Sequence, residues 1–232
     1  MERSMILPMW RLALAAAMAV ALVWIVCGDL NADDLTARVR WVVDGDTIIL
    51  DTGQTVRLLG INAPELSRDD QPGQYYAQQA RQQALELMHG AEVLVQTSRT
   101  DRFQRLVGTV HLPDGTLVNK ALVQGGAAFV SHYSHPEQRS ITGLVEVQRR
   151  AMQDEVGFWD TILSLPQATG PFVGHRRSLR FHTPECAFGQ AIHDRNRRRF
   201  LTLEQAFRAG FAPGRCCTLW PTRTEVLEGQ EN

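Results

Sequence analysis

The sequence has little cysteine, almost no lysine and no excess of charge of either sign. Four cysteines in 232 residues are too few for a fold built on disulfides. Lys120 is the single lysine among 24 basic residues, and the formal net charge is −1. With 7% aromatic residues, 18 glycines and 10 prolines, the chain is neither collagen-like nor of low complexity. Hydrophobic residues make up 44%, which is enough for a core and excludes a disordered chain.

The chain has a single long apolar run, from Leu12 to Val26, and Arg3 and Arg11 precede it. This run is shorter than the roughly 20 residues that a membrane-spanning helix needs. A basic start followed by an apolar stretch of this length is typical of a signal peptide. Residues 1–32 are therefore expected to be a signal peptide or an uncleaved membrane anchor. Both readings place the rest of the chain outside the cytoplasm, as a periplasmic, extracellular or membrane-tethered protein.

The near-zero net charge hides an uneven distribution. Residues 33–160 carry 12 basic and 17 acidic side chains, whereas residues 161–232 carry ten arginines and six acidic side chains. Such asymmetry indicates that the C-terminal part meets a polyanion such as nucleic acid. A solvated basic face is the alternative.

Alternating apolar and polar residues predict short strands, and Asp-Gly pairs predict tight turns between them. Segments rich in Ala, Gln, Leu and Glu predict helices. We expect strands at 38–43, 47–50, 55–61, 93–95 and 106–110, and helices at 74–89, 120–125 and 137–153. Asn119 is expected to cap the second of these helices. Five short strands with interposed helices indicate an α+β fold, namely a five-stranded barrel of the oligonucleotide-binding (OB) type.

After the predicted barrel, the sequence contains proline and glycine and lacks hydrophobic periodicity, which indicates a linker. Thr202 and Gln205 further on have the spacing of a capping box, which predicts a short helix up to Ala209. The expected domains are the N-terminal segment, a barrel domain at 33–160, a linker at 161–174, a small basic Cys/His α/β module at 175–218 and a tail at 219–232.

Four fragments carry the residues that matter for chemistry. They are VDGDT at 43–47, VRLLGINAPE at 56–65, DRFQRL at 101–106 and VNKALVQGGAA at 118–128. Each fragment alone reads as a turn, a strand or a loop. Together, in this order and at this spacing, they resemble the thermonuclease family of staphylococcal-nuclease-like phosphodiesterases, over about residues 38–160.

The residue types also suit phosphodiester hydrolysis, which must stabilise negative charge on a phosphorane-like transition state. Arg57 and Arg105 can each offer a planar fork of donors to phosphate oxygens. Asp46 supplies a hard oxygen ligand suited to Ca²⁺. Glu65 follows a proline at a strand end, where a rigid carboxylate can act as a base.

The resemblance implies an endonuclease that cleaves DNA and RNA to 3′-phosphates. It assigns Ca²⁺ binding to Asp46, to position 62 and to the main-chain carbonyl of Ala63. It assigns catalysis to Arg57, Glu65 and Arg105.

The sequence departs from the family pattern at three positions. Asn62 stands where a carboxylate ligand is usual, which removes one negative charge and predicts weaker Ca²⁺ binding. Gln104 replaces a glycine that the family prefers before the arginine, which matters if the turn requires a positive φ. His132 lies where a nucleotide-stacking Tyr is common, so it is expected either to contact nucleic acid or to be an ordinary loop residue.

The segment 178–218 resembles the small zinc-binding module of the Ada DNA-repair methyltransferase. His182 and Cys186 fit the first ligand pair, and Cys217 fits the last position. Glycine occupies the third position, with Cys216 as an extra cysteine beside Cys217. These four side chains could form a His/Cys₃ zinc site. The alternative is a metal-free remnant, with a disulfide at Cys186 in an oxidising compartment.

Arginines cluster around this module, and the run Arg197, Arg198 and Arg199 is the best candidate for contact with nucleic acid. The sequence thus predicts an exported, monomeric, Ca²⁺-dependent endonuclease that acts on DNA or RNA. Two alternatives remain. One is a catalytically weak or inactive nucleic-acid-binding protein of the same fold, and the other is a DNA-processing factor at the cell surface.

Overall fold

The computed structural model describes residues 34–69, 71–131, 143–217 and 220–230. The N-terminal segment and His132 lie outside the described residues. No helix in the described part of the chain has the length and apolar character needed to cross a membrane. The first domain contains, in chain order, β1 (Leu35–Asp44), β2 (Thr47–Leu50), β3 (Thr55–Leu58), β4 (Ile61–Asn62), α2 (Ala77–Met88), β5 (Glu92–Thr100), β6 (Leu106–His111), α3 (Val118–Gln124), β7 (Phe129–Val130), α4 (Leu144–Gln153) and α5 (Trp159–Ser164).

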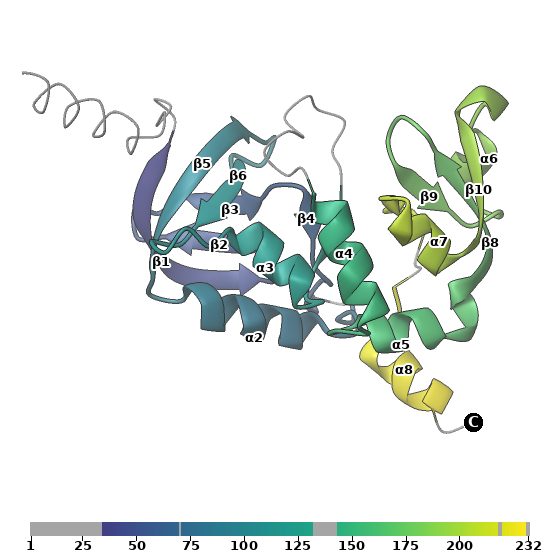
Figure 1. Ribbon diagram of the computed structural model, residues 1–232, viewed down its shortest axis with the longest axis horizontal. Coiled ribbons are helices and arrows are strands. Elements are labelled where there is room, and N and C mark those ends of the chain that lie inside the picture. The colour runs from purple at the N-terminus through teal and green to yellow at the C-terminus, as the bar shows by residue number, and fades with distance from the viewer. Residues whose placement is uncertain (1–33, 70, 132–142, 218–219, 231–232) are drawn as a thin grey trace, which may run out of the picture. The chain divides into compact units, whose positions relative to one another are not determined.

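The five long strands close into a barrel in the order β1-β2-β3-β6-β5, which confirms the predicted α+β barrel (Figure 1). Strands β1, β2 and β3 form the expected meander, with the first turn at the Asp-Gly pair. β3 then pairs in parallel with β6, and β1 pairs with β5 to close the barrel. The expected strand 55–61 is divided into β3 and β4, because Gly60 adopts a φ of +78° between them.

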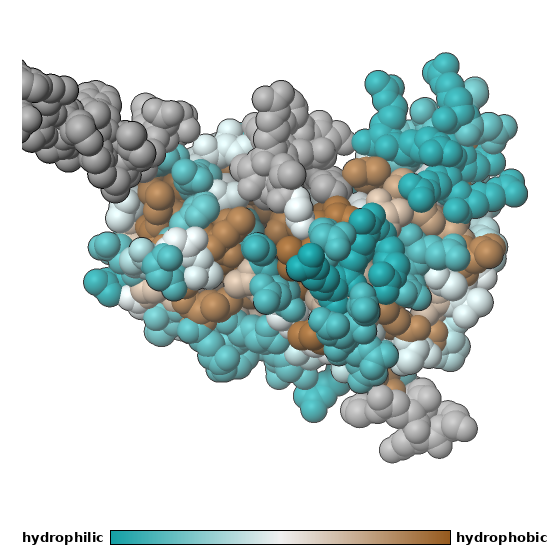
Figure 2. Space-filling view, in the orientation of Figure 1, coloured by the Kyte–Doolittle hydropathy of each residue, from teal (hydrophilic) through white to brown (hydrophobic). Residues whose placement is uncertain are grey.

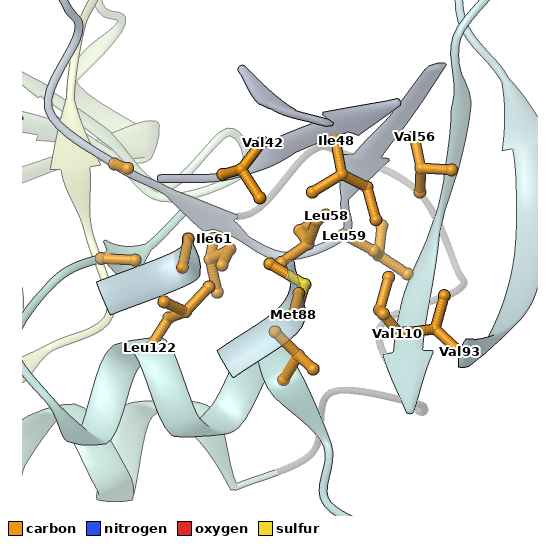
Figure 3. Close-up of a cluster of buried hydrophobic side chains, with 14 of the residues drawn as sticks. Val42, Ile48, Val56, Leu58, Leu59, Ile61, Met88, Val93, Val110 and Leu122 are labelled. Carbon is orange, nitrogen blue, oxygen red and sulfur yellow. The ribbon is translucent and has the colours of Figure 1, made fainter. Parts of the chain in front are cut away.

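Alternation along the strands fills the barrel with aliphatic side chains. Val42, Ile48, Val56, Leu58 and Val110 are fully buried there, as Figure 3 shows. Met88 of α2 and Leu122 of α3 belong to the same cluster, so the two helices cover the barrel.

Asn119 was expected to cap the short helix, but it lies inside α3 and is fully buried. Its Nδ2 donates to Leu59 O at 2.9 Å, and its Oδ1 accepts from Val110 N at 3.0 Å. A buried amide with both ends bonded links α3 to β6 and to the turn after β3, which local capping rules do not predict.

A second sheet, of order β10-β8-β9-β11, forms the C-terminal module. Residues 161–174, expected to be a linker, instead hold the end of α5, η2 and most of β8, so they do not form a linker.

Thr202 caps α7 as predicted, because its Oγ1 accepts from Gln205 N at 3.1 Å. The module's elements are η2 (Pro166–Ala168), β8 (Thr169–His175), β9 (Arg180–His182), α6 (Ala187–Gln190), η3 (Asp194–Asn196), β10 (Arg197–Thr202), α7 (Leu203–Arg208), β11 (Ala212–Pro213) and α8 (Arg223–Gln230).

An aromatic cluster joins this module to the last helices of the barrel domain. Phe129, Phe158 and Trp159 pack there with Phe207 and Trp220. Fully buried Gln148 of α4 bridges the two parts, since its Oε1 accepts from β7 and its Nε2 donates to α7. The expected free tail at 219–232 is also wrong, because it holds buried Trp220 and α8.

Candidate active site

Asp46 follows the Asp-Gly turn between β1 and β2 and is 4% exposed. Its Oδ2 lies 2.9 Å from Arg57 Nη2 and accepts from Ala63 N at 2.7 Å. Its Oδ1 accepts from Thr47 Oγ1 at 3.0 Å. The carboxylate thus stands at the centre of a buried polar group that draws on β2, β3 and the end of β4.

The strand register produces this meeting. Thr47 of β2 pairs with Arg57 of β3. The Arg57 side chain therefore comes from the strand beside the turn that holds Asp46. Gly45 allows the chain after β4 to come close, because a Cβ there would lie 2.6 Å from the Cβ of Ala63. Only glycine at position 45 leaves room for the Ala63 backbone to reach Asp46.

Four oxygen atoms hold the Arg57 side chain in one orientation. Its Nη1 donates to Leu58 O at 2.9 Å and to Ile61 O at 3.0 Å. Its Nη2 contacts Asp46 and also donates to Asn62 Oδ1 at 2.8 Å. Arg57 is therefore a fixed cation beside the predicted metal ligands, with 6% of its surface exposed.

The three predicted Ca²⁺ ligands are brought together. Asn62 links them, since its Oδ1 accepts from Arg57 and its Nδ2 donates to Ala63 O at 3.1 Å. The set offers the Asp46 carboxylate, the Asn62 amide oxygen and the Ala63 carbonyl, all of them hard oxygen donors. This donor chemistry fits Ca²⁺, with one negative charge fewer than a second carboxylate would give.

The electrostatics at Asp46 also favour a cation. Burial raises the pKa of Asp46 to about 7, and repulsion from Asp44 and Glu65 adds to the rise. The charge of Arg57 works in the opposite direction but does not cancel the effect of burial. A bound cation would favour the ionised carboxylate.

Glu65 lies beside this group and faces solvent, since its side chain is 55% exposed. Arg68 approaches it, with 3.7 Å from Arg68 Nη2 to Glu65 Oε2. The same Nη2 lies 3.3 Å from Asp44 Oδ2. A surface carboxylate next to a buried ligand set can accept a proton from water, as a general base requires.

Arg105 is held by Asp101 rather than by the Arg57 group. Its Nε and Nη2 lie 2.9 and 2.8 Å from Asp101 Oδ2, and Asp101 Oδ1 caps the turn by accepting from Phe103 N and Arg105 N. The parallel pairing of Leu106 with Val56 places Arg105 next to the start of β3. Gln104 adopts a φ of +62°, so this turn does require the conformation that a glycine adopts most easily.

Sequence reasoning missed Phe103 and Arg68. Phe103 is 61% exposed, and the guanidinium carbons of Arg102 and Arg105 lie 4.7 and 5.4 Å from its ring centroid. An exposed aromatic ring within an arginine-bearing turn was the available signal. Arg68 gave no signal, because its role depends on the folded path of the loop after β4.

In the C-terminal module, His182, Cys186, Cys216 and Cys217 form one cluster whose ligand atoms all lie within 4.8 Å of one another. His182 Nδ1 is 3.5, 3.3 and 3.5 Å from the three sulfur atoms in sequence order. Cys216 Sγ lies 3.3 Å from Cys186 Sγ and 3.8 Å from Cys217 Sγ. All three cysteines are free thiols, so the disulfide alternative is absent from this structure.

A glycine makes room for the histidine in this cluster. A Cβ at Gly214 would lie 2.4 Å from His182 Cε1, and a Cβ at Gly189 would lie 2.9 Å from the His182 Cβ. The imidazole of His182 thus occupies the space that a ligand side chain at position 214 would need. Cys216 supplies the remaining sulfur.

The titration properties of the cluster suit a metal ion. Burial lowers the pKa of His182, which keeps the imidazole neutral. Burial raises the pKa of Cys217 to about 12 and also raises that of Cys216. A backbone hydrogen bond from Gly189 lowers the pKa of Cys186. Two of the three thiols thus need a nearby cation to ionise near neutral pH.

The predicted nucleic-acid residues of β10 point in different directions. Arg197 donates to Ile192 O at 2.7 Å and pairs with Asp194 at 3.1 Å. Arg198 stacks over Phe200, with 5.0 Å from its guanidinium carbon to the ring centroid. Arg199 is exposed. On the face shown in Figure 2, hydrophilic side chains gather over this module.

The chain is similar to nucleases. A family model described as "Staphylococcal nuclease homologue" matches residues 55–161. An "Uncharacterized endonuclease" of Escherichia coli O157:H7 is 32% identical over 145 residues, which are 61% of this chain and 85% of that relative. "Protein ParB" of Escherichia coli is 30% identical over 171 residues, 69% of this chain and 90% of the relative. "Thermonuclease" of Staphylococcus hyicus is 27% identical over 134 residues, 56% of this chain and 78% of the relative.

Proposed function

Because the chain belongs to the family of staphylococcal nuclease homologues and is a hydrolase of the nuclease type, we propose that it is a Ca²⁺-dependent endonuclease that hydrolyses DNA or RNA to 3′-phosphates. The observation that carries the proposal is the buried contact of Asp46 and Arg57 beside the oxygens of Asn62 and Ala63. It combines hard ligands for a cation with the positive charge of a guanidinium that is fixed beside them.

Each residue of the site has a chemical task in this proposal. Asp46, Asn62 and Ala63 O would hold Ca²⁺, which supplies positive charge to a phosphate oxygen. Arg57 and Arg105 supply positive charge to the phosphate, and their carboxylate partners fix their orientation. Glu65 takes a proton from the attacking water, and its solvent-facing position gives water access to it.

Cleavage of a plasmid and a single-stranded oligonucleotide by the full-length protein tests this function. Glu65→Ala is expected to abolish Ca²⁺-dependent cleavage while the protein still binds DNA. Glu92→Ala is the matched control, because Glu92 is an exposed carboxylate on β5. Labelling of the products by a polynucleotide kinase without prior phosphatase treatment would reveal the 5′-hydroxyl ends that accompany 3′-phosphates.

The alternative function is a nucleic-acid-binding protein with a weakened metal site. Asn62 favours it, since the site has lost one charge for the cation. A folded wild-type protein that binds DNA but cleaves nothing up to tens of millimolar Ca²⁺ would support this alternative against the nuclease.

We also propose that the C-terminal cluster binds Zn²⁺. A tetrahedral ion with Zn–S bonds of about 2.3 Å and a Zn–N bond of about 2.0 Å separates its ligands by about 3.8 Å between sulfurs and about 3.5 Å between sulfur and nitrogen. The distances in the cluster, 3.3 and 3.8 Å between sulfurs and 3.3 to 3.5 Å to His182 Nδ1, are close to these values. Metal analysis of the purified protein should find zinc, and intermolecular or Cys186 disulfides in its place would contradict the proposal.

The remaining parts of the proposal concern location and partners. Arg3, Arg11 and the apolar run after them support export or a membrane tether, with a monomer as the working form. Arg198 and Arg199 support contact with nucleic acid outside the active site. Reversal of their charge to Glu should reduce the salt dependence of DNA binding, whereas Arg150→Glu on α4 should leave it nearly unchanged. An unchanged salt dependence in both variants would contradict the role of β10.

A further inference from the structure

The last described segment of the chain, Trp220–Val226, returns to the barrel domain, and we call it the strap. Trp220 is 8% exposed and stacks on Phe129, with 5.1 Å between ring centroids and 23° between planes. Its ring also meets Phe158 edge-on at 4.8 Å. These contacts bury one large aromatic side chain at the start of the strap and hold it against the domain that carries the active site.

The strap then bonds to Gln74 and Tyr75, which lie in the loop before α2. Trp220 Nε1 donates to Tyr75 O at 3.0 Å, and Tyr75 N donates to Pro221 O at 2.8 Å. Thr222 forms an antiparallel bridge with Gln74. These contacts fix the backbone of Gln74 and Tyr75 from the C-terminal side.

Within the strap, a capping box fixes the start of α8. Thr222 N donates to Glu225 Oε2 at 2.6 Å, and Glu225 N donates to Thr222 Oγ1 at 3.2 Å, so α8 begins at a defined place. A hollow of about 410 Å³ lies between the strap and the loop before α2, and residues of both segments line it. The strap and this loop therefore face each other.

Gln74 connects the strap to Glu65. Glu65 N donates to Gln74 Oε1 at 2.8 Å, and Gln74 N donates to Glu65 O at 2.9 Å. Both main-chain groups of Glu65 are thus bonded to one residue. This backbone pairing and the contact of Arg68 with Oε2 together restrain where the half-exposed carboxylate of Glu65 stands.

We propose that the strap positions Glu65 through Gln74, so that the C-terminal end of the chain sets the geometry of the nuclease site. The inference rests on the proposed function, in which Glu65 is the base. Gln74 is a positioning residue, since it acts only through the backbone of Glu65. A base that is displaced by about 1 Å can cost on the order of a hundredfold in rate.

The first test compares Gln74→Ala with Gln79→Ala, an exposed glutamine on α2. Gln74→Ala should lower kcat by about tenfold or more, with little change in KM or in the Ca²⁺ concentration at half-saturation, because the ligand set is untouched. Gln79→Ala should match the wild type. In a Glu65→Ala background, Gln74→Ala should cause no further loss, since the residue through which it acts is gone.

The second test concerns the strap. Trp220→Phe keeps an aromatic ring against Phe129 but removes the hydrogen bond to Tyr75 O. It should lower kcat in the folded protein, accelerate amide exchange at Glu65, and combine with Gln74→Ala less than additively. Thermal melting shows whether each variant remains folded.

The outcomes separate this inference from the function itself. A wild-type protein that never cleaves would overturn the nuclease proposal. A wild-type protein that cleaves and loses activity in Glu65→Ala, while Gln74→Ala retains full kcat, would overturn the positioning role alone. Equal losses from Gln74→Ala with and without Glu65 would also overturn it, because they would indicate a general structural effect.

Discussion

The barrel and the C-terminal module each gather a set of side chains suited to a cation, but they are built differently. In the barrel, the carboxylate of Asp46 is buried and already has a positive partner, Arg57, at 2.9 Å. In the module, three thiols and the imidazole of His182 approach one another, and burial favours the neutral forms of His182, Cys216 and Cys217. The proposed Ca²⁺ site thus has a positive partner from the protein itself, whereas the thiols of the proposed Zn²⁺ site would need the ion in order to ionise.

The two sites also differ in the metal ion that their ligand types favour. Carboxylate, amide and carbonyl oxygens suit a hard cation that exchanges quickly, and thiolates suit Zn²⁺. Only the barrel set lies beside Arg57 and Glu65, which have the chemistry for hydrolysis. Under the proposed function, catalysis belongs to the barrel site, and the zinc site stabilises the fold of the module.

Loss of Arg57 should have the largest effect. Arg57→Ala is expected to lower kcat/KM by roughly a thousandfold, because a fixed donor to the transition state is removed. It should also destabilise the fold by about 3–5 kcal/mol, since the buried Asp46 loses its partner. Kinetics and chemical denaturation measure both effects, with Arg40→Ala, at an exposed arginine of β1, as control. A stable, active Arg57→Ala protein would remove the basis of the comparison.

Loss of His182 should separate the two sites. His182→Ala is expected to abolish zinc binding and to lower the melting temperature, while the Ca²⁺ concentration at half-saturation of cleavage stays the same. His193→Ala, at an exposed histidine of the same module, should retain zinc. Elemental analysis and thermal melting report the result. A shift in Ca²⁺ dependence would show that the two sets share a metal or compete for one.

A change at Asn62 should sharpen the account of the barrel site. Asn62→Asp is expected to lower the Ca²⁺ concentration at half-saturation by about tenfold, equivalent to about 1.4 kcal/mol, because it restores a negative ligand. Asn62→Ala should shift it in the opposite direction by removing the oxygen. Calcium titrations of cleavage measure both shifts. If the two variants shift in the same direction, position 62 is not a ligand.

The last expected effect is a pH dependence of stability in the metal-free protein. Burial raises the pKa of Asp46 from 3.8 to about 7, so between these values the folded state keeps a proton that the unfolded state has lost. The resulting stability is fully present below about pH 4 and is lost as the pH rises towards 7. In EDTA, the unfolding free energy of the wild type minus that of Asp46→Asn should fall over this range. A rise would mean that Arg57 dominates and that the pKa is depressed.

The barrel and the identity of its chemical residues could be predicted because the relevant signals are local. Alternating strands and the Asp-Gly turn placed Asp46 one strand away from Arg57, and the register confirms that neighbourhood. The His/Cys cluster could be predicted as a set of residue types. The sequence did not show that Gly214 makes the space for His182.

The features that were missed depend on contacts between distant segments. Asn119 looked like a helix cap but serves as a buried bridge to Leu59 and Val110. The linker and tail expectations failed because their apolar residues pack against aromatic side chains far away in the chain, as Trp220 does against Phe129. The capping-box spacing of Thr222 and Glu225 was present in the sequence and could have revealed α8.

The most direct test of the central claim is the recovery of cleavage after metal removal in the wild type and in Asp46→Asn. The full-length protein is treated with EGTA, and Ca²⁺ or Zn²⁺ is then added back while plasmid cleavage is followed. We expect EGTA to stop cleavage, Ca²⁺ but not Zn²⁺ to restore it in the wild type, and neither ion to restore it in Asp46→Asn. Cleavage by Asp46→Asn at the wild-type Ca²⁺ dependence, or restoration by Zn²⁺ alone, would contradict the assignment of hydrolysis to the oxygen-lined site.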